Sequence, residues 1–228
     1  MDRLRTDLHA HLVPGVDDGS RSSMETISMA KGLRGLGIRR VHVTPHQFRF
    51  GNDFTVEELE RMAADVRQLL ALALVELEVV AGAEYCYGAR LLDALEHDEE
   101  LMTFRFGDEP CVLIELPLRQ PVAGVRNVAA ALRRRGIRPV MAHPERLDRS
   151  LVNRDRVLGW FQAGWSFQVN LLSFVGYHGE EAASLAREML REGSVLGVGS
   201  DIHRPSELGL LARAFGRYRQ LASAEACP

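Results

Sequence analysis

Cysteine is scarce in this chain of 228 residues. Its three cysteines, Cys86, Cys111 and Cys227, are odd in number and widely spaced. This usage argues against a disulfide framework and favours a reducing compartment. It also argues against a closed structural zinc site, because such a site is built largely from cysteine thiolates. We interpret Cys86 and Cys111 as small packing residues.

Long apolar runs and a strong charge of one sign are lacking as well. No apolar stretch approaches the roughly 18–20 residues that a membrane-spanning helix needs. The N-terminus begins without an apolar signal region. The 28 basic and 31 acidic residues give a net charge of −3, which offers no electrostatic reason to expect a nucleic-acid partner. The sequence therefore predicts a cytoplasmic protein without a membrane span.

Internal repeats, linkers and low-complexity stretches are missing too. The sequence therefore predicts a single domain over residues 1–228, and its 46% hydrophobic residues are enough for a core. The tail after about Arg217 is polar and rich in small residues, so we expect it to fray.

What the chain does contain is a regular alternation of short apolar runs and helix-like stretches. This pattern is typical of βα units around a parallel sheet. Ser22-x-x-Glu25 and Thr55-x-x-Glu58 match the capping box and indicate two helix starts. The predicted strands are Leu4–His9, Arg40–Thr44, Leu77–Gly82, Cys111–Leu116, Pro139–Ala142, Ser166–Asn170 and Val195–Gly199.

Polar residues end these predicted strands one after another. They are His9, His46, Glu84, Glu115, His143 and Asp201. The alternation alone does not distinguish an open, doubly wound sheet from a closed barrel. In βα barrels, however, the C-terminal ends of the strands carry the chemistry. The placement of the polar residues therefore favours an α/β barrel of seven βα units.

The residues at that end are of the types that bind metal ions. His9-Ala10-His11 puts two imidazoles on one face of a strand, because side chains alternate with period two. A mixed imidazole and carboxylate set suits Mn²⁺, Fe or Zn²⁺ in an open, catalytic site. Two or three ions that share a bridging carboxylate would use all the candidates. The nine candidate ligands are His9, His11, Asp17, His46, Glu84, Glu115, His143, Asp201 and His203.

The charges of these ligands indicate what such a site would bind. Four of the nine are carboxylates, so two divalent ions are balanced and three leave the pocket positive. A positive pocket stabilises a phosphoryl group, whose oxygens gain negative charge as an ester breaks. Clustered metal ions also lower the pKa of a bound water. The ligand set favours hydrolysis of a phosphate ester, and more weakly of an amide.

Arginines next to the candidate ligands are candidates for phosphate binding. Arg146 lies on the loop after a predicted strand, where its guanidinium can grip two phosphate oxygens. The alternative is a surface ion pair with Glu145 or Asp148. Arg204, beside His203, is the second candidate.

Three histidines fall outside the candidate ligand set. His42 lies in the middle of a predicted strand and His97 in an acidic stretch, so we interpret both as structural. His178 follows Val175-Gly176-Tyr177, and we expect it to be a solvated loop histidine.

Six motifs follow one another in order along the chain. They are Asp7-Leu-His-Ala-His-Leu-Val-Pro-Gly-Val-Asp-Asp-Gly-Ser20, Val43-Thr-Pro-His46, Gly82-Ala-Glu84, Leu113-Ile-Glu-Leu-Pro117, Ala142-His-Pro-Glu-Arg146 and Gly199-Ser-Asp-Ile-His203. Together they resemble the motifs of the PHP (polymerase and histidinol phosphatase) superfamily. Within it, the chain is similar to the bacterial tyrosine-protein phosphatases of the CpsB/CapC/YwqE type. The Pro-Gly-x-Asp-Asp-Gly of the first motif and the His-Pro-Glu-Arg segment are the features specific to that type.

The resemblance implies a distorted, TIM-like (β/α)7 barrel that holds up to three metal ions, usually Mn²⁺. It implies that Arg146 binds the phosphate. Family members often carry a short turn before Arg-Pro, whereas here Arg204-Pro205 directly follows His203, which leaves the role of Arg204 open. By position, one ion takes His9, His11, Glu84 and Asp201, a second takes Glu84, Glu115 and His143, and a third takes Asp17, His46 and His203.

The function that the resemblance implies is hydrolysis of phosphotyrosine on a protein. The partner would be a bacterial tyrosine kinase that controls capsule or exopolysaccharide synthesis. No cysteine nucleophile is needed, and the Cys-x₅-Arg loop of thiol phosphatases is absent. The alternatives are a small-molecule PHP phosphatase, such as one for histidinol phosphate, and a catalytically silent regulatory member. The complete ligand set argues against the silent member.

The sequence also suggests how a tyrosyl group would be selected. The segment Gln47–Val56 and the loop Ser173–Gly179, with Phe174, Tyr177 and His178, are expected to form an aromatic rim.

Overall fold

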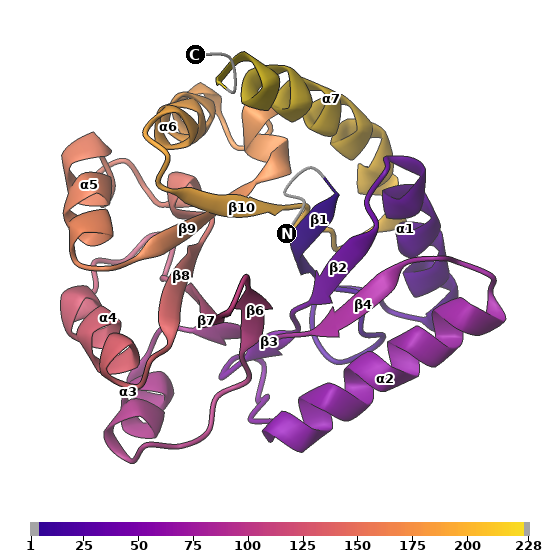
Figure 1. Ribbon diagram of the computed structural model, residues 1–228, viewed down its shortest axis with the longest axis horizontal. Helices are drawn as coiled ribbons and strands as arrows, with labels where there is room; N and C mark the ends of the chain where they lie inside the picture. The colour runs from indigo at the N-terminus through magenta and orange to yellow at the C-terminus, as the bar shows by residue number, and fades with distance from the viewer. Residues whose placement is uncertain (1–4, 226–228) are drawn as a thin grey trace.

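The structure, a computed structural model, describes residues 5–225. The strands within this range are arranged around a common centre and the helices lie outside them (Figure 1). The strands are β1 (Thr6–Ala10), β2 (Arg40–Val43), β3 (His46–Gln47), β4 (Glu78–Ala81), β5 (Glu84–Cys86), β6 (Phe104–Phe106), β7 (Glu109–Glu115), β8 (Arg138–Ala142), β9 (Ser166–Asn170) and β10 (Val195–Gly199).

The strands form two sheets that together make the wall of a barrel. One sheet has the order β1-β2-β4, and the other has the order β10-β9-β8-β7-β5-β3. All of these neighbours pair in parallel. β3 follows β2 after Thr44-Pro45, and β5 follows β4 after Gly82-Ala83, so each pair is one strand position with a break. The breaks distort the barrel and divide its wall into two sheets.

The wall closes where β10 meets β1. The backbone N–H of Asp201 donates to the carbonyl of His9 (2.8 Å), and that of His11 donates to the carbonyl of Ile202 (3.2 Å). The Asp7 carboxylate accepts from the Ser200 backbone N–H (2.8 Å). This contact joins the first and last strands. The predicted (β/α)7 barrel is therefore confirmed.

Helices cover the outside of the barrel (Figure 1). Thr55 begins α2 with both hydrogen bonds of a capping box, whereas Ser22 caps α1 alone, because Glu25 accepts from the backbone of Arg21 instead. The α-helices of residues 5–225 are α1 (Ser23–Gly35), α2 (Val56–Leu72), α3 (Ala89–Glu96), α4 (Val125–Arg134), α5 (Arg154–Gln162), α6 (Glu180–Arg191) and α7 (Leu208–Glu225). Short 3₁₀ segments are η1 (Pro144–Arg146), η2 (Leu171–Val175) and η3 (Pro205–Glu207).

The C-terminal helix includes the segment after Arg217, for which the sequence predicts fraying. α7 continues to Glu225, and Leu221 and Ala222 pack against the hydrophobic core. Burial of this apolar side of the helix keeps the segment helical. None of the helices in residues 5–225 combines the length and the hydropathy needed to cross a membrane.

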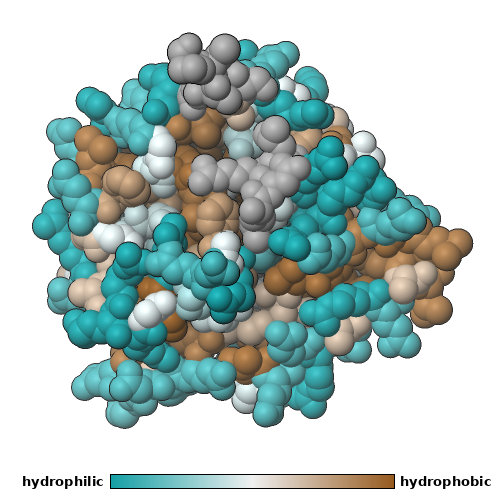
Figure 2. All heavy atoms as spheres, in the orientation of Figure 1, coloured by the Kyte–Doolittle hydropathy of each residue, from teal (hydrophilic) through white to brown (hydrophobic). Residues whose placement is uncertain are grey.

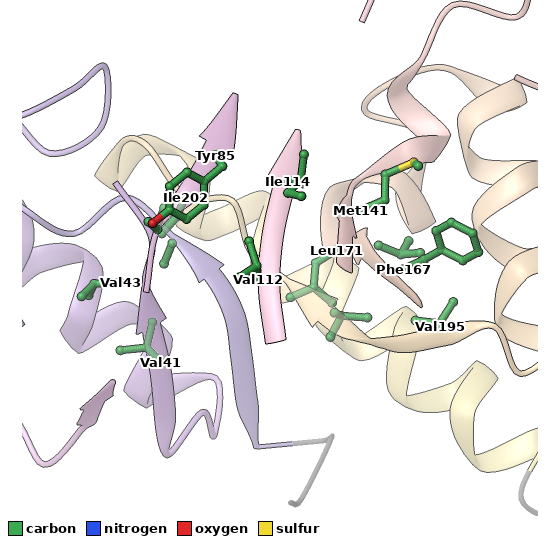
Figure 3. Packing of buried hydrophobic residues seen from close by; sticks show 14 of the residues in the cluster. Val41, Val43, Tyr85, Val112, Ile114, Met141, Phe167, Leu171, Val195 and Ile202 are labelled. Atoms are coloured by element: carbon green, nitrogen blue, oxygen red, sulfur yellow. The ribbon is translucent and has the colours of Figure 1, made fainter. Parts of the chain in front are cut away.

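Two layers of apolar side chains hold the barrel together, and β7 contributes to both. Val112 and Ile114 (labelled in Figure 3) belong to the large cluster that also holds apolar residues of the helices, whereas Cys111 and Leu113 pack in a second cluster with residues of β1, β6, β8 and β10. This alternation has the period of two that a strand imposes. Glu115 continues the inward series at the end of β7, which turns its carboxylate toward the barrel axis.

The short strand β6 had no counterpart in the sequence prediction. It pairs antiparallel with β7, and its Phe104 belongs to the inner cluster. His42 of β2 lies edge-on to the Phe104 ring at 4.9 Å. β6 thus fills the barrel below the strand ends.

The outer surface is mostly polar on the face toward the viewer (Figure 2). A hydrophobic corner appears where α2 ends, and Leu72 and Leu74 there are 78% and 90% exposed.

Candidate metal centre

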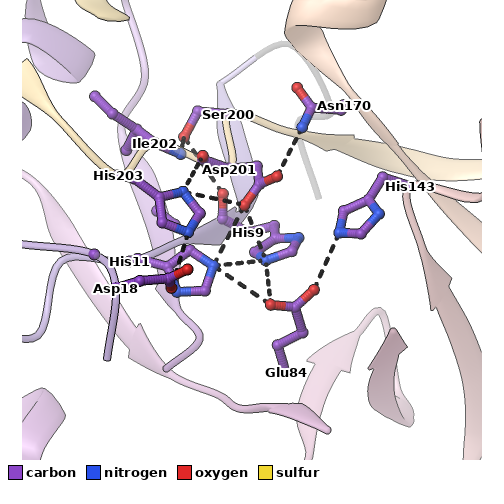
Figure 4. Close-up of polar contacts among 12 residues, drawn as sticks. His9, His11, Asp18, Glu84, His143, Asn170, Ser200, Asp201, Ile202 and His203 are labelled. Atoms are coloured by element: carbon purple, nitrogen blue, oxygen red, sulfur yellow. Dashed lines mark hydrogen bonds and ion pairs between the residues drawn. The ribbon is translucent and has the colours of Figure 1, made fainter. Parts of the chain in front are cut away.

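Imidazoles and carboxylates converge at the C-terminal ends of the barrel strands (Figure 4). Most are buried, which is unusual for so many ionisable groups. The residues are His9, His11, Asp18, His46, Glu84, Glu115, His143, Asp201 and His203.

The His9-x-His11 pair has both Nε2 atoms directed at one point. These two atoms lie 3.0 Å apart. The Nδ1 atom of His9 lies 2.9 Å from the Gln168 amide oxygen, and Nδ1 of His11 lies 2.9 Å from the Asp17 carboxylate. Both oxygens accept hydrogen bonds, which assigns the ring protons to Nδ1 and leaves the Nε2 lone pairs available to a cation.

Glu84 lies at the middle of the centre. Its Oε2 is 3.2 Å from His9 Nε2, 3.4 Å from His11 Nε2 and 2.9 Å from His46 Nδ1. Its Oε1 is 3.1 Å from His143 Nε2. The two carboxylate oxygens therefore face different imidazoles, as they would in a carboxylate that bridges two ions.

Among the described residues, three groups of imidazoles and carboxylates are close enough together to hold a metal ion each. Within each group the atoms lie within 4.8 Å of one another. The groups are His9, His11 and Glu84; His46, Glu84 and Glu115; and His11, Asp18, His46 and His203.

Asp201 and His143 complete the surroundings of the first two groups. Asp201 Oδ1 lies 3.5 Å from His9 Nε2 and 3.3 Å from His11 Nε2. His143 Nε2 lies 3.9 Å from Glu115 Oε1. Asp201 and His143 follow β10 and β8 and have positive φ angles, 51° and 31°. Such backbone strain in residues other than glycine is concentrated at functional sites.

The donor set fits divalent transition-metal ions. Glu84 Oε2 and His46 Nδ1 lie 2.9 Å apart without the geometry of a hydrogen bond, and neither atom has another hydrogen-bond partner among the described residues. Such burial costs free energy unless a cation supplies the contact. Burial lowers the pKa of His46, but Glu84 and Asp18 outweigh it and raise that pKa to about 9. Without a metal ion, protons would have to neutralise these carboxylates. Metal binding would displace those protons.

Two glycines allow the chain to approach this close. A Cβ on Gly19 would lie 2.3 Å from His11 Cβ, and one on Gly199 would lie 2.5 Å from His9 Cβ. Any side chain at either position would push the His9-x-His11 strand away from its neighbours.

Arg146 reaches the edge of the centre from η1. Its Nη1 donates to Asp201 Oδ2, and its side chain is 24% exposed. Its ion pair is thus with Asp201, and not with Glu145 or Asp148 as in the alternative interpretation. Glu145 is buried and accepts from the Asn170 backbone N–H (2.9 Å) and the Ser173 hydroxyl (2.7 Å).

A protein-family model described as capsular polysaccharide synthesis, CpsB/CapC, matches residues 5–208. The chain belongs to the CpsB/CapC family. This agrees with the resemblance seen in its motifs.

Curated relatives of this CpsB/CapC chain carry phosphatase names. Tyrosine-protein phosphatase CpsB of Streptococcus pneumoniae is 30% identical over 206 residues, which cover 86% of this chain and 82% of the relative. Tyrosine-protein phosphatase YwqE of Bacillus subtilis is 25% identical over 198 residues, with 86% and 76% covered.

Solved structures agree on the fold. One from a study of YwqE of Bacillus subtilis and CpsB of Streptococcus pneumoniae, called unique metal-dependent tyrosine phosphatases, has a TM-score of 0.80 at 23% identity. It covers 94% of this chain and 86% of its own. Histidinol phosphate phosphatase of Lactococcus lactis, in complex with Zn, L-histidinol and phosphate, has a TM-score of 0.61 at 15% identity, with 97% and 93% covered.

Asp17 of the CpsB/CapC chain does not lie where the sequence analysis predicted. Asp17 was expected among the ligands, but its carboxylate accepts from His11 Nδ1 and from the backbone N–H groups of Gly19 and His46. Asp18 Oδ1 lies 3.4 Å from the Nε2 atoms of both His46 and His203. The structure therefore places Asp18 in the ligand group and Asp17 behind it. The Asp-Asp pair was the available signal, but it did not say which member faces inward.

Arg204 was the second candidate for phosphate binding, but its guanidinium contacts the protein backbone instead. Its guanidinium donates to the carbonyls of Asp18 (2.9 Å), Gly19 and His203 (2.8 Å). These contacts brace the loop that carries Asp18. The family difference in the Arg-Pro spacing was the sequence signal for this departure.

Arg49 is a second arginine at the CpsB/CapC centre, and the sequence analysis missed it. Its Nη1 lies 2.8 Å from Glu115 Oε2. It follows His46 by three residues on the loop after β3, as Arg146 follows His143 by three after β8. That parallel spacing was a signal in the sequence.

His178 differs from the solvated loop histidine that we expected. It is half-buried, and its Nδ1 lies 3.0 Å from the Ser173 hydroxyl. Burial and the nearby Arg146 guanidinium lower the pKa of His178 to about 4.

The burial of the two other histidines and of the cysteines can be compared with the roles predicted for them. His42 is buried away from the ligand groups, and His97 is exposed at the end of α3, consistent with structural roles. Cys111 packs in the inner cluster. Cys86 is half-buried, with Sγ 4.0 Å from Glu115 Oε2, and Cys227 lies outside the described residues.

Proposed function

We propose that this chain is a metal-dependent protein-tyrosine phosphatase that acts in capsule or exopolysaccharide synthesis. The observation that carries the proposal is the set of three ligand groups at the barrel's C-terminal end, with Arg146 at their edge. A site of this kind supplies several cations for one phosphate. Membership of the CpsB/CapC family and the names of its phosphatase relatives support the same reaction.

Nine residues would hold the ions in this proposal. Glu84 would be the carboxylate shared between ions, since its two oxygens face different imidazoles. When bound, the ions would lower the pKa of water to supply hydroxide and would neutralise the phosphate charge. One ion would take His9, His11, Glu84 and Asp201; a second would take Glu84, Glu115 and His143; and a third would take Asp18, His46 and His203.

The chain's own residues orient the substrate and the ligands. Arg146 holds two phosphate oxygens through its planar guanidinium. Asp17 and Gln168 accept from the Nδ1 atoms of His11 and His9 and so keep both Nε2 atoms free for the ions they would bind. Arg204 supports the loop of Asp18 and is a positioning residue in this scheme rather than a substrate ligand.

The metal and the partner are part of the proposal. Mn²⁺ suits the mixed nitrogen and oxygen ligands, and Fe and Zn²⁺ are the alternatives. The substrate is the phosphotyrosine of a bacterial tyrosine kinase. The scarce, scattered cysteines favour the cytoplasm as its location, and residues 1–228 act as one domain.

The experiment that tests this function compares substrates and metals directly. The protein, first treated with a chelator and then given Mn²⁺, Fe²⁺ or Zn²⁺, is assayed on a phosphotyrosine peptide and on histidinol phosphate. We expect no activity without metal, restoration by Mn²⁺, and a higher kcat/KM on the peptide. Higher kcat/KM on histidinol phosphate would contradict the protein-phosphatase assignment, and full activity after chelation would contradict the metal chemistry.

A further inference from the structure

An exposed phenylalanine stands at the rim of the metal centre. Phe50 is 55% exposed, and its ring lies edge-on to the His46 imidazole, with the ring centroids 5.4 Å apart. Its φ angle is 57°, in the left-handed region. A bulky residue pays about 1–2 kcal/mol for that conformation. Neither the exposure nor the strain helps to fold the barrel.

The turn that carries Phe50 is firmly held. The backbone N–H of Phe48 donates to the carbonyl of Asn52, and that of Asn52 donates to the carbonyl of Arg49 (2.9 Å each). The Asn52 side-chain amide donates to the carbonyls of Val16 and His46 (3.0 Å each). These bonds tie the turn to the loop before Asp17 and to a proposed ligand.

Arg49 connects the Phe50 ring to the ligand set. Its guanidinium lies 4.8 Å from the Phe50 ring centroid, while its Nη1 lies 2.8 Å from Glu115 Oε2. A cation on an aromatic ring is attracted to the ring's negative face. Arg49 is therefore a positioning residue, since it fixes the ring relative to Glu115.

The other predicted parts of the aromatic rim are less suited to this role. Phe174 is buried and packs on Tyr218 at 5.5 Å. Tyr177 is 54% exposed and lies against His178, which is not one of the ligands. Phe50 has ring contacts with a proposed ligand, His46, and with Arg49.

We propose that Phe50, held in place by Arg49 and the Asn52 turn, binds the aromatic ring of the substrate and gives the site its preference for aryl phosphates. The inference rests on the proposed function. A tyrosyl ring lies between the peptide backbone and the phosphate, so a phosphate at the ions brings the ring to the rim. An apolar ring there stacks with it, whereas a phosphoserine side chain has no ring to place.

The test compares Phe50→Ala with Phe50→Tyr and with Phe161→Ala. Phe161 is the matched control, because it is a 43% exposed phenylalanine on α5. Each Mn²⁺-loaded protein is titrated calorimetrically with phenylphosphonate and with methylphosphonate, which share the phosphoryl oxygens and differ in the ring. The kcat and KM on a phosphotyrosine peptide and the bound Mn²⁺ per chain are measured in parallel.

Phe50→Ala should weaken phenylphosphonate binding about three- to tenfold, the range expected for one aromatic pair. Methylphosphonate binding and Mn²⁺ content should change less than twofold. The KM for the peptide should rise with kcat nearly constant. Phe50→Tyr should restore phenylphosphonate binding, and Phe161→Ala should match the wild type.

Equal weakening of both phosphonates, or no change in either, would overturn the role of Phe50. A loss of bound Mn²⁺ in Phe50→Ala would also overturn it, because the residue would then support His46 instead of the substrate. A wild type that binds phenylphosphonate through Phe50 but hydrolyses no phosphate ester would refute the proposed function and leave aryl binding by Phe50 supported.

Discussion

The Nε2 atoms of His9 and His11 lie 3.0 Å apart, and both lie within 3.5 Å of Glu84 Oε2 and Asp201 Oδ1. Two imidazoles with their protons on Nδ1 would otherwise direct two lone pairs at each other and at two carboxylate oxygens. A divalent cation bound between them would remove this repulsion. The geometry makes His9 a sensitive position for testing metal binding.

His9→Ala should reduce the number of bound metal ions per chain and lower kcat sharply, whereas His97→Ala should change neither. His97 is exposed, and its side chain contacts Asp93 of its own helix. Elemental analysis of both purified variants, against two to three ions expected in the wild type, checks the prediction. Equal metal content in the two variants would contradict it.

Asp18→Asn and Asp17→Asn should affect metal binding differently. Asp18→Asn removes a charged ligand of the group with His46 and His203, so a Mn²⁺ titration should show one fewer ion per chain. Asp17→Asn only loosens the orientation of His11, so the stoichiometry should persist while affinity falls roughly 10- to 100-fold. If Asp17→Asn loses an ion and Asp18→Asn does not, Asp17 is the ligand.

Arg146→Ala should lower kcat on a phosphotyrosine peptide by roughly 10²-fold, by analogy with removal of one oxyanion donor. Metal content and thermal unfolding should stay close to wild type. Arg126→Ala, on exposed α4 surface, serves as the control. If Arg146→Ala retains activity within a few-fold, its contact with Asp201 is structural only.

His42 should make folding stability depend on pH. Burial lowers the pKa of His42 from 6.5 to about 3, and the nearby charge of Arg40 contributes a smaller part of this shift. Between these values the unfolded chain binds a proton that the native chain does not, so stability falls as pH drops below about 6.5. The contribution lost between pH 7 and pH 5 is about 2 kcal/mol.

The measurement is urea unfolding of wild type and His42→Leu at pH 7 and pH 5, with a chelator present. His42→Leu should lose about 2 kcal/mol less stability than wild type over this interval. Both ring nitrogens of His42 are buried without partners, so the substitution should cost little at pH 7. Parallel pH dependence in the two proteins would show that His42 titrates normally when folded.

Much of the fold could be read from strand-length apolar runs. β9 and β10 match the predicted bounds, and β7 is only slightly shifted. The missed strands β3, β5 and β6 have two or three residues each. So few residues carry no measurable period, and their pairing partners alone define them.

In the candidate site, too, some residues could be predicted from the sequence and others could not. His9 and His11 share a face because they are two apart, which is a local property of a strand. Asp17 and Asp18 are adjacent on a loop, where no period applies. Arg49 was missed because β3, which places it, was missed.

The sequence by itself determined which ligand types the site has and that they end consecutive strands, since side-chain alternation and strand propensity act over a few residues. The tertiary structure decided which atoms meet. Asp7 and Ser200, 193 positions apart, must pair before His9 lies beside Asp201. The choice of Asp18 over Asp17, the bracing role of Arg204 and the exposure of Phe50 all follow from loops packed by such distant contacts.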